Sequence, residues 1–108
     1  MDSHCASAGT PDLAGLARLL ADRTRAGFCL ALLDGRAWTA AELARHSGVA
    51  ASTATGHLNL MVAGGLLAEE RQGRHRYVRL ASAEAADLIE SLAEFASQRK
   101  HARLMNEP

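Results

Sequence analysis

Apolar residues recur at helical spacing in the first third of the chain, and this pattern predicts two helices. Leu13, Leu16 and Leu20 follow one another at intervals of three and four residues, so they share one helix face. Thr10 can cap this first helix. Asp22 can cap a second helix that reaches Leu33, and its residues 28–33 are apolar nearly all round, which is typical of a central, buried helix.

Two short helices with a tight connection come next. Thr39 and Glu42 have the spacing of a capping box, in which each side chain bonds the other residue's backbone amide. This helix is expected to reach Ser47, with Gly48 ending it, and another is expected over residues 51–63. A turn of about four residues that contains glycine, between two short helices, is the helix-turn-helix layout.

After Gly65 the pattern favours strands. Residues 66–72 and 75–80 predict a hairpin around Gly73, since the second segment contains tyrosine, valine and leucine. Ser82 can then cap a last helix. The apolar stripe of that helix consists of Leu88, Ile89, Leu92, Phe95 and Ala96.

This element order predicts a mainly α fold with a small β-hairpin, a winged helix-turn-helix. We expect a flexible tail over residues 1–10 and one domain over residues 11–97. Residues 98–108 form a polar C-terminal extension that either frays or prolongs the last helix.

Composition supports one helical, globular domain. The chain has 108 residues, 48% hydrophobic and 22% charged, and leucine and alanine dominate it. No apolar run approaches the roughly 20 residues that span a membrane, and the N-terminus lacks the features of a signal peptide. Two cysteines 24 positions apart suit a reducing compartment, so a cytoplasmic protein without membrane association is expected.

The second helix of the predicted pair has a face suited to a DNA groove. Ala54, Leu58, Met61 and Val62 form its inward stripe. The short polar residues opposite can read base edges in a major groove, although any exposed helix face is polar. These candidate recognition residues are Ser52, Thr53, Thr55, Gly56, His57 and Asn59.

The hairpin carries a basic cluster that can serve as a DNA-binding wing. Arg71, Arg74, His75 and Arg76 flank its turn, where they can contact phosphates beside or across the minor groove. The alternative is a charged hairpin edge that only prevents aggregation. The net charge of zero counts against nucleic acid, but residues 35–80 carry six basic and three acidic groups. The basic excess is thus confined to the predicted DNA-binding part.

The sequence resembles the ArsR/SmtB family of bacterial transcriptional regulators over about residues 11–96. The resemblance rests on Leu20-Ala21-Asp22-Arg23-Thr24-Arg25, Thr39-Ala40-Ala41-Glu42-Leu43-Ala44, Ser52-Thr53-Ala54-Thr55-Gly56-His57-Leu58, Gly65-Leu66-Leu67 and Gly73-Arg74-His75-Arg76-Tyr77. It implies a homodimer formed by the first and last helices, binding a palindromic operator in double-stranded DNA and usually repressing. Its dimerisation residues would be Leu13, Leu16, Leu20, Leu88, Leu92 and Phe95.

Gly56 departs from the family, in which a larger polar or charged residue is commoner. One hypothesis is that the helix backbone lies close to the groove at Gly56 and that DNA shape contributes more to recognition. The other is that this glycine simply weakens binding or specificity.

The metal sites common in this family have no counterpart at the matching positions. Thr39 and Ala41 stand where one site has cysteines. The positions of a second site, on the last helix, carry Ser82, Glu84, Phe95 and Gln98, which cannot form an oxygen–nitrogen ligand set. We therefore expect no metal and no cofactor, with His4-Cys5, joined by His101 of a second subunit, as the weaker alternative.

The two cysteines are also candidates for thiol sensing. Cys29 lies in the apolar second helix, where a small core residue is the simpler interpretation. A disulfide switch between Cys5 and Cys29 is the alternative, and it requires an exposed, electropositive setting. No residue pattern identifies an effector.

The sequence thus predicts a dimeric, DNA-binding transcriptional repressor. It has no phosphate-binding glycine loop, nucleophile elbow or spaced Cys–His pair, so an enzyme is not expected. Two alternatives remain. One is a winged-helix module for protein interaction or oligomerisation, which the neutral charge suits, and the other is the DNA-binding part of a longer regulator.

Overall fold

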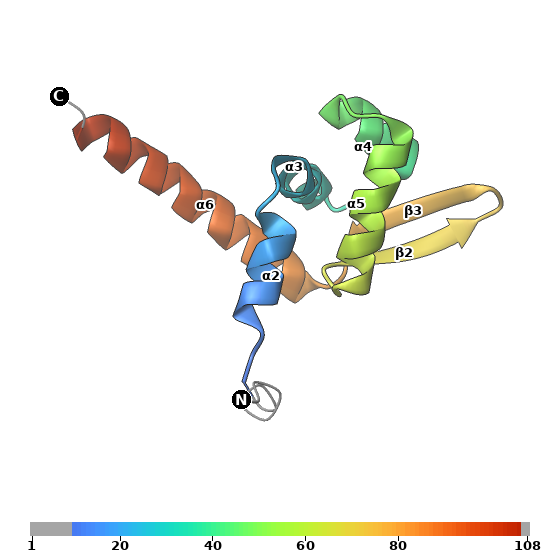
Figure 1. The fold of residues 1–108 in the computed structure, drawn as a ribbon, viewed down its shortest axis with the longest axis horizontal. Coiled ribbons are helices and arrows are strands. Elements are labelled where there is room, and N and C mark those ends of the chain that lie inside the picture. Colours follow the sequence, from blue (N-terminus) through green and yellow to red (C-terminus); the bar gives the residue numbers. More distant parts are fainter. Residues whose placement is uncertain (1–9, 107–108) are drawn as a thin grey trace, which may run out of the picture.

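The computed structural model describes residues 10–106, which form a helical body, a three-stranded sheet and one long projecting helix (Figure 1). The elements are α2 (Leu13–Leu20), α3 (Arg23–Ala31), a 3-10 turn η1 (Leu32–Asp34), β1 (Trp38–Thr39), α4 (Ala40–Ser47), α5 (Ala51–Ala63), β2 (Leu67–Gln72), β3 (His75–Leu80) and α6 (Ala83–Asn106). The predicted winged helix-turn-helix is confirmed.

Side-chain caps fix the starts of α2 and α4. Asp12, rather than Thr10, caps α2, because its carboxylate accepts the Gly15 amide at 3.0 Å. The predicted capping box is present at α4: the Thr39 hydroxyl accepts the Glu42 amide at 3.1 Å, and the Glu42 carboxylate accepts the Thr39 amide at 2.8 Å. The Thr39 amide is also the main reason why the pKa of Glu42 is lowered.

The helix-turn-helix closes on a glycine. Gly48 ends α4 in the left-handed region, with φ of 68°, which costs a residue without a Cβ little. The chain then enters α5 within three residues. α3 is shorter than predicted: it ends at Ala31 and tightens into the 3-10 turn η1.

The hairpin belongs to a sheet with one more strand than the sequence suggested. β3 pairs antiparallel with both β2 and β1, in the order β1-β3-β2. Only Trp38 and Thr39 form β1, too few residues to produce a visible alternation. The tip has Gly73 at φ 62° followed by Arg74 at a negative φ, as in a type II′ turn.

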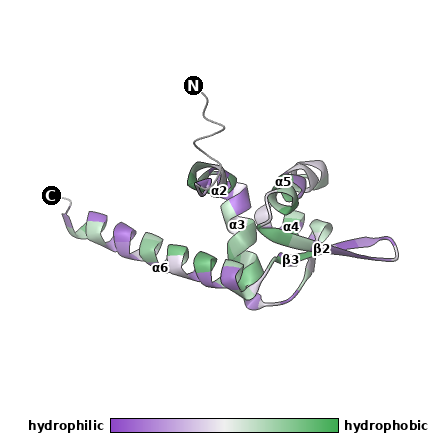
Figure 2. Ribbon diagram, turned by 90° about the horizontal axis from the view of Figure 1, so that it is seen from below, coloured by the Kyte–Doolittle hydropathy of each residue, from purple (hydrophilic) through white to green (hydrophobic). Residues whose placement is uncertain are grey.

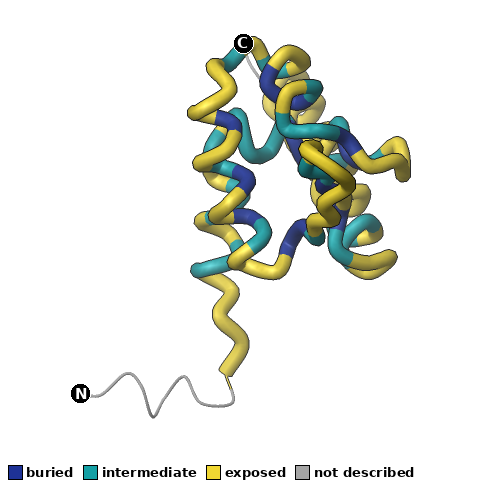
Figure 3. Tube along the Cα trace, turned by 90° about the vertical axis from the view of Figure 1, so that its right-hand side faces the viewer, coloured by how far each residue is buried: buried dark blue, intermediate teal, exposed yellow. Residues whose placement is uncertain are grey.

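The core lies where α3, α4, α5 and the sheet meet. Leu58 and Met61 of α5 are fully buried with Phe28, Leu43 and Val78. The buried segments in Figure 3 concentrate in this part of the molecule. The inward stripe predicted for α5 is confirmed, with Val62 packed at its edge. The core therefore holds α5 so that its opposite face meets solvent.

The last helix is longer than the predicted domain. α6 continues without a break to Asn106, so most of residues 98–108 prolong it, and they are exposed. At 1.5 Å per residue its 24 residues span about 36 Å. It projects away from the hairpin, and the two lie at opposite ends of the molecule (Figures 1 and 2).

Candidate nucleic-acid interface

The outer face of α5 is exposed and polar, as predicted. Ser52, Thr53, Thr55, Gly56 and Asn59 are all exposed. A Cβ placed on Gly56 would meet no atom within 4 Å, so the surface here is open. This face can approach the floor of a groove without a bulky side chain in the way.

His57 does not belong to that exposed face. Its side chain is only 19% exposed and turns toward α3. Arg25 Nη1 lies 3.1 Å from Nδ1 of the ring, Asp22 Oδ2 lies 3.8 Å from Nε2, and the Phe28 ring is in edge contact. Since arginine only donates, Nδ1 must accept and the proton sits on Nε2, toward Asp22. The structure thus places His57, one of the candidate recognition residues, at the junction of α5 with α3.

Arg25 of α3 connects this junction to a third helix, α2. Besides His57, its guanidinium donates to the backbone oxygens of Leu19 (2.8 Å) and Arg18 (3.1 Å), which end α2. The first turn of α3 thus ties the end of α2 to the middle of α5. Asp22 caps α3 through the Arg25 amide, and this bond is the largest cause of its lowered pKa. Sequence reasoning missed Arg25 because its partner on α5 lies 32 positions away.

Arg76 also has a different role from the one predicted. Its side chain is only 13% exposed and bridges two elements. Nε donates to Glu69 on β2, and Nη1 donates to Asn59 Oδ1 on α5 at 2.8 Å. Arg76, predicted as a wing residue, is thus engaged in this structure as a brace between the hairpin and α5.

Three basic residues near the tip of the hairpin are accessible to a ligand. Arg71, Arg74 and His75 are exposed, and Arg74 occupies the tip. In Figure 2 the outer part of the hairpin is coloured as hydrophilic.

An open cleft of about 550 Å³ separates the hairpin from the helix-turn-helix. Arg71, Arg74 and His75 line one side, while Thr55 of α5 and Arg45 of α4 line the other. Cationic side chains on both sides suit a polyanion backbone.

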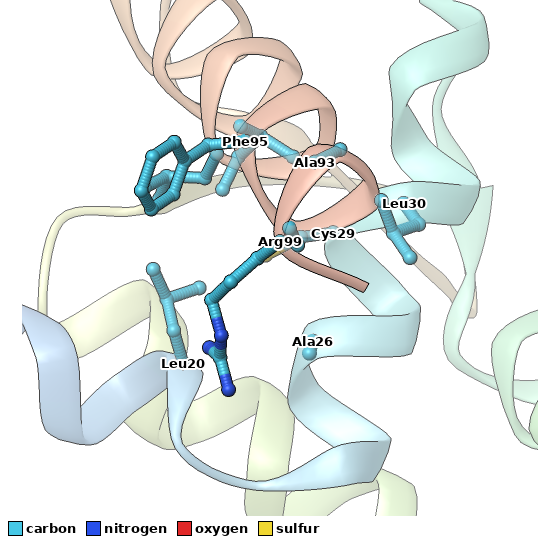
Figure 4. A pocket seen from close by; sticks show the side chains of 10 residues that line it. Leu20, Ala26, Cys29, Leu30, Ala93, Phe95 and Arg99 are labelled. Atoms are coloured by element: carbon cyan, nitrogen blue, oxygen red, sulfur yellow. The ribbon is translucent and has the colours of Figure 1, made fainter. Parts of the chain in front are cut away.

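An apolar groove lies on the other side of the molecule, between α3 and α6. It has a volume of about 340 Å³, and Leu20, Leu30, Leu92 and Phe95 line it with Cys29 (Figure 4). The exposed fractions of Leu30 and Phe95 are 52% and 64%. Such apolar exposure is typical of a surface that meets a partner.

The predicted dimerisation residues divide into two groups. Leu13, Leu92 and Phe95 are exposed, whereas Leu16 and Leu20 pack partly against the chain's own core, and Leu88 is half-buried. Leu30 was missed because the apolar pattern of residues 28–33 indicated complete burial. Within this run, α3 instead leaves the Leu30 side chain exposed.

Cys29 fits the core interpretation better than the sensor interpretation. Its side chain is 1% exposed, and burial raises the pKa of the thiol from 9.0 to about 11. A thiol with so high a pKa holds almost no reactive thiolate at neutral pH. Cys5, His4 and the rest of residues 1–9 lie outside the described residues. Within residues 10–106, no three histidine, cysteine, aspartate or glutamate side chains gather closely enough to hold a metal ion.

No helix of the described part of the chain is long and apolar enough to cross a membrane. The combination of a helix-turn-helix, a basic hairpin wing and a long terminal helix defines the winged-helix class of transcriptional regulators. A model described as "Helix-turn-helix domain" matches residues 20–70, which run from the end of α2 through β2.

Two curated relatives place the chain more closely. The uncharacterised HTH-type transcriptional regulator YdfF of Bacillus subtilis is 41% identical over 90 residues, which cover 83% of this chain and 40% of YdfF. The HTH-type transcriptional regulator CmtR of Mycobacterium tuberculosis is 35% identical over 82 residues, covering 76% of this chain and 69% of CmtR. The chain thus spans less than half the length of YdfF.

Solved structures agree with this placement. The NMR structure of CmtR, a cadmium metal-sensor, matches with a TM-score of 0.62 at 35% identity, over 74% of this chain and 82% of that one. The homodimeric winged helix-turn-helix domain of Mycobacterium bovis Mb0332 shares the fold, with a TM-score of 0.77 at 23% identity, over 88% and 94% of the two chains. The chain belongs to the ArsR/SmtB family of winged helix-turn-helix transcriptional regulators.

Proposed function

We propose that this chain is a sequence-specific, duplex-DNA-binding repressor that acts as a homodimer on a palindromic operator. The observation that carries the proposal is the cleft between α5 and the hairpin, with arginines on both sides and a short polar helix face beside it. Ser52, Thr53, Thr55 and Asn59 would face base edges in the major groove. Arg71, Arg74 and His75 would contact phosphates.

The second subunit would sit on the apolar groove between α3 and α6. Phe95, Leu92 and Leu30 expose more apolar surface there than a monomer in water favours. A two-fold dimer places its two recognition helices about one DNA turn apart, so half-sites should repeat every ~10–11 base pairs. Mb0332, which shares the fold, is homodimeric. An effector would act by favouring a dimer geometry that fits the operator less well.

The salt dependence of duplex binding tests the proposed interface. Each phosphate contact contributes about one unit to the slope of log affinity against log salt concentration. Arg74→Ala should reduce the slope by about one unit and weaken binding to all duplexes equally. Arg103→Ala, which removes an exposed charge from the far end of α6, is the matched control and should leave the slope unchanged. Equal slopes for the wild-type protein and the two variants would show that the hairpin tip does not contact the DNA phosphates.

The same measurement tests one of two other assignments. The zero net charge favours a module for protein interaction or oligomerisation, which would keep the dimer but show no steep salt-dependent affinity for DNA. The 40% coverage of YdfF favours the DNA-binding part of a longer regulator, which would bind DNA as proposed. We further propose that the protein acts in the cytoplasm and catalyses no reaction, in keeping with regulators as its relatives.

A further inference from the structure

The contact between the hairpin and α5 fixes how one recognition residue can read DNA. We infer that Asn59 recognises a base through its amide N–H donors alone, because Arg76 occupies its carbonyl oxygen. Its partner would be a base edge that offers an acceptor without an N–H donor beside it, guanine or thymine, in the major groove. This inference rests on the proposed DNA-binding function.

The orientation of the Asn59 amide follows from its partner. Arg76 Nη1 lies 2.8 Å from Asn59 Oδ1, and arginine has no acceptor, so the oxygen and not the nitrogen must face it. Asn59 itself is exposed on the outer face of α5. Its amino group therefore remains available to a ligand.

Arg76 is held firmly enough to maintain this orientation. Its Nε donates to the Glu69 carboxylate on the neighbouring strand, and its side chain is largely buried. Val78 and Glu69 are register partners in the same ladder, so β2 and β3 keep the Glu69–Arg76 pair together. The brace is thus part of the folded hairpin.

The consequence for recognition comes from donor and acceptor chemistry. A free asparagine prefers adenine, because its oxygen accepts from N6 while its nitrogen donates to N7. At Asn59 the guanidinium lies against that oxygen, and its positive charge repels a second N–H donor such as the adenine amino group. Guanine, with acceptors at N7 and O6, and thymine, with O4, still satisfy the free amino group.

Sequencing the duplexes selected from a random pool by the full chain and its variants tests this inference. The wild-type protein should favour guanine or thymine, by about threefold to tenfold over adenine, at one position of each half-site. Asn59→Asp keeps an acceptor for Arg76 but removes every donor, so this position should change to cytosine, whose N4 donates. Asn59→Ala should leave it without preference.

A second pair of variants separates the brace from a simple loss of charge. Arg76→Met frees the Asn59 oxygen, so adenine should gain at the same position. Arg71→Met removes a charge from the residue paired with Arg76 across the hairpin, but Arg71 is exposed and has no bond to Asn59 among the described contacts. It should weaken binding to all duplexes and leave the selected sequence unchanged.

The outcomes distinguish this inference from the function on which it rests. Unchanged base preference in Asn59→Asp and Asn59→Ala, in proteins that melt like the wild type, would overturn the inference and leave DNA binding intact. An adenine preference in the wild-type protein would overturn it too. If the wild-type protein selects no duplex at all, the proposed function fails first, before any variant is compared.

Discussion

The two surfaces of this molecule differ in how their side chains are held. On the proposed DNA-binding surface, formed by α5 and the hairpin, the side chains of Asn59 and Arg76 are hydrogen-bonded to each other in the free protein. On the opposite side, the groove between α3 and α6 exposes the large apolar side chains of Leu30, Leu92 and Phe95. The side chains of the first surface are held by bonds within the fold. The apolar groove is the surface on which we propose that a second subunit packs.

The charges divide in the same way. Residues 35–80 carry a net charge of +3, while residues 1–34 and 81–108 carry −1 and −2. The net charge of zero therefore combines a basic DNA-binding segment, residues 35–80, with mildly acidic terminal segments. Such a protein should show weak non-specific binding and little long-range steering to DNA. The comparison teaches that net charge is a poor guide when two surfaces of one domain have different partners.

The largest expected effect comes from placing a charge in the apolar groove. Phe95→Asp should disrupt the dimer, because it replaces an exposed aromatic side chain of the groove with a carboxylate that loses its hydration when the interface closes. Operator affinity should fall about 100-fold or more, since two half-sites would no longer be bound together. Analytical ultracentrifugation and binding to a full operator measure the two effects.

A matched change keeps the Phe95 result interpretable. Glu94 is exposed on the same helix but does not line the groove, so Glu94→Ala should leave the dimer intact. Phe95 is itself 64% exposed, so the fold should survive its replacement. If the Phe95→Asp protein still sediments as a dimer, the dimer interface does not lie in this groove.

Cys29, beneath the same groove, should make stability depend on alkaline pH. The folded state holds the thiol proton up to about pH 11, whereas the unfolded thiol loses it from pH 9.0. The folded state thus binds more protons in this window, and the free energy of unfolding should fall by about 2–3 kcal/mol as the pH rises through it. Denaturant titrations of wild-type and Cys29→Ala proteins measure this, since the alanine variant lacks that contribution. Rapid labelling of the folded thiol at pH 7 would instead reinstate the sensor interpretation.

Arg25 joins the end of α2 to α5, and its removal should lower both the stability of the fold and the affinity for the operator. Arg25→Met keeps the aliphatic stem but loses the bonds to Leu19, Arg18 and His57. We expect the free energy of unfolding to fall by about 1–2 kcal/mol. Because α5 also loses its link to the end of α2, operator affinity should fall by roughly tenfold. Chemical denaturation and binding assays check the two values, with Arg23→Met on the same helix as control; equal behaviour of the two variants would argue against the junction.

The smallest effect is expected at Gly56. Alanine there meets open space and should stabilise α5 by up to ~1 kcal/mol, because glycine is a poor helix former. If the backbone approaches the groove closely, the added methyl group should weaken operator binding a few-fold despite the more stable fold. Thermal melting and operator affinity separate the two contributions. Unchanged affinity and unchanged base preference would rule out close approach.

Much of the fold was predictable because its signals are local. The capping box at Thr39 and Glu42, the glycine after α4 and the apolar stripe of α5 each lie within one or two helical turns. The turn at Gly73 similarly predicted the hairpin. The exact end of α6 was not predictable, since polar residues beyond Ser97 are compatible with either a helix or a frayed end.

The candidate site was only partly predictable, for a physical reason. Sequence spacing correctly placed Thr55 and Asn59 on the exposed face of α5, and Arg74 at the tip of the hairpin. It could not show that His57 turns toward Arg25, 32 positions away. These roles depend on contacts between elements that helical and strand periods do not encode.

The sequence by itself determined the class of fold, the order of its elements and the local concentration of basic charge, because caps, turns and apolar periods act over a few residues. Only the tertiary structure decided which polar side chains are free and which are engaged. Arg74 and Arg76 are two positions apart, yet one lies exposed at the tip and the other is bonded to α5. That difference arises from how the hairpin packs on the helix, which is a property of the assembled fold.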